Sequence, residues 1–121
     1  MCLYPKYKLK KAKHDIVCYK VMLNKKSNIF YSIYWNTNEP WYIGEFKKGK
    51  HVWGRDFIFS GEIGSGYIHS YKDERDVITS CDDFRCVCKC IIPKGSYYYE
   101  GIHSDGKYGY ASKKLKIVKK L

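Results

Sequence analysis

The sequence has no run of about 18 apolar residues and no apolar segment after its first methionine. A helix that crosses a membrane needs about 20 consecutive apolar residues, and a secretory signal needs an apolar segment of about 7–15. We therefore expect neither a membrane span nor a secretory signal. The protein is expected to act in the cytoplasm and to have no membrane partner.

Acidic residues are missing from both ends of the chain. Residues 1–13 contain five lysines and no acid, and residues 113–121 again contain five lysines and no acid. These two segments therefore supply ten of the eleven net positive charges, whereas residues 14–112 are nearly neutral. Two arrangements fit this distribution: the two ends form one basic face, or they are solvating tails on a neutral domain.

Arginine is scarce, since only Arg55, Arg75 and Arg85 of the 23 basic residues are arginines. Arginine supplies the two-pronged donor that reads guanine or grips a carboxylate, whereas lysine is a flexible point charge. The bias towards lysine therefore fits loose contact with phosphates, or simple solubility, better than base-specific recognition.

The composition predicts a single folded domain over residues 1–121, with residues 1–13 as a basic arm and residues 113–121 as a basic closing strand or tail. Apolar residues make up 45% of the chain and aromatic residues 17%, which is enough to form a core. Turn signals recur at roughly 8–12-residue intervals, so we expect a mainly β (α+β) fold with a small, curled antiparallel sheet resembling a barrel or sandwich. The expected strands are 16–23, 29–35, 41–46, 52–59, 67–71, 84–92, 97–100 and 114–118, with turns at 47–50 and 93–95, one short helix at 72–80 and a glycine-rich loop at 101–109.

The cysteines resemble a metal site only superficially. Cys86, Cys88 and Cys90 alternate along one expected strand, so they share a face but lie too far apart to chelate one ion easily. Free cysteine is also among the most often buried residues, and Cys81, Cys2 and Cys18 add no convincing second pair. We expect these thiols to pack in the core, and we expect no metal, no cofactor and no catalytic residue.

A strand that carries Tyr67, His69 and Tyr71 on one face could hold a nucleobase or ribose by stacking and hydrogen bonding. The alternative is an ordinary half-buried sheet face. In the run 97–99 at least one tyrosine must point outward, because successive strand residues face opposite ways. Lysines 114 and 116 alternate with Leu115 and Ile117, which predicts a strand that buries one face and presents lysines on the other. The expected ligand-binding residues are Tyr67, His69, Tyr71, Lys94, Tyr98, Lys114 and Lys116.

The segments YKV (19–21), GYIHSY (66–71), CIIPKGSYYYEG (90–101) and YASKKLKI (110–117) resemble a loose group of small uncharacterised proteins from gut Bacteroides-type bacteria and their phages. The resemblance covers about half of the chain, and no activity is assigned to its motifs. It implies a phage or mobile-element setting, in which small proteins often block host defence. It therefore places the protein in the cytoplasm of the bacterium or of the infected host.

Three functions are compatible with these observations. The first is a non-enzymatic binder of a phosphate-bearing ligand, either a nucleotide signal held by the aromatic residues or a nucleic acid held by the lysines. The second is a protein-interaction module that docks an acidic host partner through exposed aromatic residues. The third is an enzyme similar to ADP-ribosyl transferases, with His69, Tyr71 and Glu100 as its active-site trio. The sequence leaves the oligomeric state open.

Overall fold

The computed structural model describes residues 3–26, 29–33, 39–49, 58–59, 62–63, 67–78 and 85–121. Within these ranges the chain forms strands and one five-residue helix, α1 (Glu74–Ile78). The strands are β1 (Leu3–Pro5), β2 (Lys10–Lys11), β3 (Ile16–Lys26), β4 (Ile29–Tyr31), β5 (Pro40–Tyr42), β6 (Phe46–Lys48), β7 (Ile58–Phe59), β8 (Glu62–Ile63), β9 (Ile68–Tyr71), β10 (Arg85–Ile92), β11 (Tyr97–His103), β12 (Tyr108–Ser112) and β13 (Lys114–Lys120). The expected mainly β fold with one short helix is confirmed.

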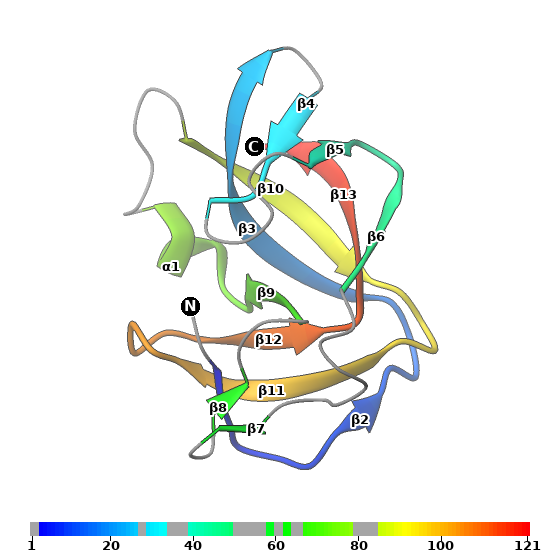
Figure 1. The fold of residues 1–121 in the computed structure, drawn as a ribbon, viewed down its shortest axis with the longest axis vertical. Helices are drawn as coiled ribbons and strands as arrows, with labels where there is room; N and C mark the ends of the chain where they lie inside the picture. Colours follow the sequence, from blue (N-terminus) through cyan, green and yellow to red (C-terminus); the bar gives the residue numbers. More distant parts are fainter. Residues whose placement is uncertain are drawn as a thin grey trace.

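All the described strands belong to one antiparallel sheet, whose main path runs β6-β13-β10-β3-β9-β12-β11-β1-β8-β7. Figure 1 shows β3, β10 and β13 side by side in the upper part of the molecule and β9, β12 and β11 below them. The path is open among the described residues, because its two ends, β6 and β7, do not pair with each other. The expectation of a barrel-like closure is therefore not met.

The largest core lies on one face of this sheet and includes buried residues of β3, β4, β10 and β13. Met22 and Phe30 contribute from β3 and β4, and Leu115 and Ile117 from β13, each at most 1% exposed. A smaller cluster around Val77 lies where α1 covers β3, β9 and β10 (Figure 1). Because α1 is a single short turn of helix, packing of Val77 rather than helix propensity holds it in place.

Both basic ends of the chain are strands of the sheet. Near the N-terminus, β1 pairs with β11 and β8, and β2 pairs with β11. At the C-terminus, β13 lies between β10 and β6. The basic arm expected over residues 1–13 thus contributes two short strands, β1 and β2, and the expected closing strand at the C-terminus is present as β13.

Three further expectations differ from the structure. The expected turn at 47–50 is in part strand, because β6 pairs with β13, and the expected strand 41–46 ends at Tyr42, after which Gly44 adopts a φ of 88°. The expected loop 101–109 is a hairpin instead: β11 continues to His103, and β12 starts at Tyr108. Most of the expected strand 52–59 lies outside the described residues.

Candidate polyanion-binding surface

The two lysine-rich ends meet at Tyr97. On one side Tyr97 is the direct partner of Lys11 in the β11–β2 ladder. On the other side the backbone carbonyl of Tyr97 accepts a hydrogen bond of 3.1 Å from the backbone N–H of Lys113, the residue that leads into β13. Lys11 and Lys113 thus lie on either side of Tyr97, although they are about a hundred residues apart in the sequence. Of the two arrangements that the charge distribution allows, this geometry favours a joined basic face.

A phenylalanine ring lies among the lysines at the edge of the sheet. Phe46 and Lys48 on β6 pair with Lys116 and Lys114 on β13, and directly paired residues project from the same face of a sheet. The Lys114 and Lys116 ammonium groups lie 5.2 and 4.9 Å from the centre of the Phe46 ring. The opposite face of β13 is the core, because Leu115 and Ile117 are fully buried there. The expected lysine row on β13 is therefore confirmed, and the ring at its centre is an addition.

The same combination of an exposed ring and a lysine occurs where β2 pairs with β11, at Tyr97. Its side chain is 49% exposed, equal to that of Phe46, and the Lys11 ammonium group lies 5.9 Å from its ring centre. We call these two groups of lysines and rings, which the Lys113–Tyr97 backbone hydrogen bond links, the basic surface. It consists of Lys11, Phe46, Lys48, Tyr97, Lys114 and Lys116.

Four of the seven expected ligand-binding residues are buried. Tyr67, His69, Tyr71 and Tyr98 are each at most 9% exposed, so the exposed aromatic face expected on β9 is not present. Tyr67 packs edge-on against Tyr99 with ring centres 5.5 Å apart, and Tyr98 packs in the same way against Tyr110 at 5.9 Å. For His69 and Tyr71 the physical reason is that β9 lies between β3 and β12 and that side chains on both of its faces are buried. The outward tyrosine of the run 97–99 is Tyr97, not Tyr98.

The three expected lysines are accessible. Lys94 is exposed in the turn between β10 and β11, where its backbone N–H donates a 2.9 Å hydrogen bond to the Asp15 carboxylate. The next residue, Gly95, donates its N–H to the carbonyl of Ala12, so this turn lies against the end of the N-terminal basic segment. Lys114 and Lys116 belong to the basic surface. The structure thus places the expected lysines on the outside and all of the expected rings on the inside.

The trio expected for a transferase does not converge. Along β12, Tyr110 pairs with Glu100 on one side and with Ser70 on the other, so Glu100 is in register with Ser70. His69 and Tyr71 flank Ser70 and project from the opposite face of the sheet. The Glu100 carboxylate instead accepts a 2.5 Å hydrogen bond from the Tyr108 hydroxyl.

A buried histidine pair occupies the place where the aromatic pocket was expected. His103 is 1% exposed, and its ring lies 5.0 Å from that of Tyr71 and 5.5 Å from that of His69. Its Nε2 lies 2.6 Å from the carbonyl oxygen of Ser70 and must therefore donate. No side-chain or backbone group of the described residues makes a hydrogen bond to its buried Nδ1. Burial accordingly lowers the pKa of His103.

This arrangement makes the stability of the fold sensitive to acid. Because the pKa of His103 is lower in the folded than in the unfolded protein, stability is complete above the unfolded value of about 6.5 and falls as the pH drops from there towards the folded value. We expect the loss to reach at most about 1.4 kcal/mol per pH unit in that window. Urea unfolding at a series of pH values measures it. His103→Gln, which keeps a donor for Ser70 but does not titrate, should flatten this dependence; an unchanged slope would contradict the assignment.

The thiols lie in the main core, as expected for Cys86, Cys88 and Cys90. Their exposed fractions are 8%, 0% and 0%, and Cys18 is directly opposite Cys90 on β3. Burial raises the pKa of Cys18 to about 12 and that of Cys90 well above its usual value, so both stay protonated at neutral pH. No three metal-ligating side chains of the described part of the chain come together as an ion site. Cys81 lies outside the described residues.

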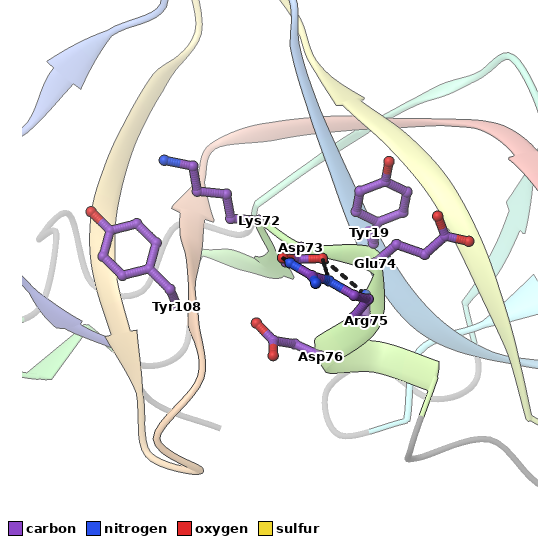
Figure 2. Close-up of a pocket in the computed structure, with 7 residues that line it drawn as sticks. All are labelled: Tyr19, Lys72, Asp73, Glu74, Arg75, Asp76 and Tyr108. Atoms are coloured by element: carbon purple, nitrogen blue, oxygen red, sulfur yellow. Dashed lines mark hydrogen bonds and ion pairs between the residues drawn. The ribbon is translucent and has the colours of Figure 1, made fainter.

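The hollow beside α1 is open and has the opposite charge to the basic surface. It has a volume of about 660 Å³ and is lined by Tyr19, Lys72, Asp73, Glu74, Arg75, Asp76 and Tyr108. In Figure 2 the Arg75 guanidinium folds back onto Asp73, while Tyr19 and Tyr108 stand on either side. Three acidic and two basic side chains leave one net negative charge, so this hollow does not suit a phosphate group.

Comparisons with protein-family models, with curated proteins and with solved structures found no match. No helix of the described ranges is long and apolar enough to cross a membrane. The sequence missed Phe46 and Tyr97 as surface residues. The alternation in 97–99 shows only that one tyrosine or more faces outward, and the burial of Tyr98 and Tyr99 identifies it as Tyr97. Phe46 is recognisable only from the pairing of β6 with β13.

Proposed function

We propose that the protein is a non-enzymatic, sequence-independent nucleic-acid-binding protein and that the basic surface is its binding site. The observation that carries the proposal is the junction at Tyr97, to which strand β2 is paired and the backbone of Lys113 is hydrogen-bonded, so that both acid-free ends of the chain reach one residue of the sheet. If the lysines served only solubility, they could lie equally well on unpaired tails. Lysines fixed on paired strands beside exposed rings instead form a surface on which phosphates can be neutralised together.

The composition of the surface supports binding to the backbone rather than to base edges. Its four cations are lysines, which act as point charges, and it contains none of the arginines, asparagines or glutamines that read bases in pairs of hydrogen bonds. The absence of an acidic residue from the set means that phosphates meet no repulsion from its own members. Contacts of this kind fix position and affinity but carry little sequence information.

Binding through such a surface depends steeply on salt. Fluorescence anisotropy with labelled oligonucleotides of several sequences, measured from about 50 to 200 mM salt, tests the proposal. If four lysines each displace counterions, the slope of log K against log salt is about −2.8 for a single strand and about −3.6 for a duplex, and affinity falls about 50- to 150-fold over that range. All sequences should bind with similar affinity. No binding at the lowest salt, or a slope near zero, would refute the proposal.

The alternative of a protein-interaction module has support elsewhere on the molecule. Tyr4 and Ile102 are cross-strand partners on β1 and β11, and they are 44% and 47% exposed. Tyr7, 45% exposed, lies between Lys6 and Lys10, whose ammonium groups are 5.8 and 4.1 Å from its ring centre. An acidic protein could dock on such an apolar patch with lysines at its rim. Salt-sensitive binding to an acidic protein that Tyr4→Ala weakens, without any binding to oligonucleotides, would favour this alternative. The phage setting and a counter-defence function stay predictions.

A further inference from the structure

We infer that the basic surface selects single-stranded over double-stranded nucleic acid, with Phe46 and Tyr97 as platforms on which unpaired bases stack. This inference rests on the proposed function and names the ligand class of the same site. It starts from two side chains that phosphate binding leaves unexplained. Lysines alone are sufficient to hold a phosphate backbone, yet the two most exposed aromatic side chains of the described residues lie among them.

Phe46 has no polar atom to satisfy, so its 49% exposure has no hydrogen-bonding reason. An aliphatic or polar residue would serve equally well on an edge strand, and lysines already protect that edge against aggregation. The ring is exposed, and the Lys114 and Lys116 ammonium groups are 5.2 and 4.9 Å from its centre, so it presents an apolar surface close to two cations. A nucleobase, which is planar and is flanked by negatively charged phosphates, suits this arrangement.

The four side chains at this edge form a compact set of one ring and three ammonium groups. Phe46 and Lys48 are two residues apart on β6, and so are Lys114 and Lys116 on β13. Residues two apart on a strand are about 7 Å apart, and paired strands are about 5 Å apart. A base on Phe46 therefore leaves its neighbouring phosphates within reach of Lys48, Lys114 and Lys116. Tyr97 and Lys11 offer a second ring with its own cation farther along the surface.

A duplex cannot use these rings, because its bases are already stacked inside the helix. A duplex contacts the basic surface only through its phosphates. The lysines therefore contribute to the binding of both single and double strands, whereas the rings contribute only to the binding of single strands. Stacking of a base on an aromatic side chain is worth about 1–3 kcal/mol and tolerates every base. One ring therefore predicts a preference of about 5- to 150-fold for single strands.

The experiment compares a labelled oligo(dT) with a duplex of mixed sequence, using wild-type protein and variants. We expect Phe46→Ala to weaken binding to oligo(dT) about 5- to 150-fold with an unchanged salt slope, and to leave duplex binding unaffected. Phe46→Leu, which keeps apolar bulk at an exposed edge, should behave like Phe46→Ala, and Phe46→Trp should keep or strengthen binding. Tyr4→Ala removes an equally accessible ring outside the basic surface and is the matched control with no expected effect.

The outcomes separate this inference from the proposed function. If the wild-type protein binds neither oligonucleotide, the proposed function fails before any variant is measured. If it binds both equally, or if Phe46→Ala and Phe46→Leu weaken both equally, the basic surface binds polyanions without selecting single strands, and the inference is wrong. Binding of oligo(dT) that is insensitive to position 46 but lost on Tyr4→Ala would move the stacking site to the β1–β11 face and would equally overturn it.

Discussion

Lys114→Glu combined with Lys116→Glu is expected to weaken nucleic-acid binding about 30-fold or more near 0.1 M salt, because two phosphate contacts are lost and two repulsive charges are added. These lysines project from one face of β13 and lie near Phe46 of the neighbouring strand β6. Leu115 and Ile117 project from the other face and anchor the strand in the core. The fold should therefore survive the substitution. Anisotropy titration against one oligonucleotide measures the loss.

The salt dependence provides a second, independent readout. Removing two phosphate contacts from a single-strand complex should make the slope of log K against log salt shallower by about 1.4. A general loss of positive charge would shift the affinity without removing particular contacts. The slope thus distinguishes direct phosphate binding by Lys114 and Lys116 from long-range attraction.

The matched control is Lys72→Glu combined with Arg75→Glu, which changes the net charge by the same four units. Both residues are exposed at the acidic hollow, Lys72 just before α1 and Arg75 within it (Figure 2). The Arg75–Asp73 ion pair that this control breaks is a surface pair at 2.9 Å, and such pairs contribute little to stability. Equal losses of affinity in the two double variants would show that net charge, rather than the basic surface, determines binding.

The sequence predicted the lysine face better than the aromatic site, and the difference has a physical cause. Burying an unpaired charge costs much free energy, so the alternation of lysine with leucine and isoleucine along residues 114–117 determines which face of β13 is exposed to solvent. Tyrosine suits both environments, and local alternation cannot tell whether a strand is central or at an edge. His69 and Tyr71 are buried because β9 lies between β3 and β12, which is a property of the topology.

The sequence does not predict β12, the strand that pairs with β9. β12 (Tyr108–Ser112) starts with Tyr108-Gly109, and nearby glycines make this region resemble a loop, since glycine weakens strands. In the structure Gly109 is a strand residue at a close approach of three chain segments, directly between Gly101 on β11 and Tyr71 on β9. A glycine of this kind indicates tight packing rather than flexibility, which only the neighbouring backbone reveals.

Gly109→Ala is accordingly expected to cause one of the largest losses of stability in the chain. A Cβ atom at this position would overlap with the backbone carbonyl oxygen of Ser70 and with the Nε2 atom of His103. These two atoms form the 2.6 Å hydrogen bond that holds the His103 ring, so neither can move without breaking it. Overpacking combined with the loss of a buried hydrogen bond should lower the free energy of unfolding by about 3 kcal/mol or more.

Thermal unfolding followed by circular dichroism measures this effect, and a loss of about 3 kcal/mol corresponds to a fall in Tm of about 10 °C or more for a domain of this size. Gly106→Ala is the control, because a Cβ there meets no atom within 4 Å and only the positive φ of 85° opposes it. That conformation costs an alanine about 1–2 kcal/mol. If the two variants were equally stable, steric overlap at Gly109 would not be the dominant cost, and the close contact of β12 with Ser70 and His103 would be wrong. A clearly larger loss for Gly109→Ala would instead establish that β12 packs tightly against Ser70 and His103, and with it the reason why the side chains of His69 and Tyr71 are not accessible to a ligand.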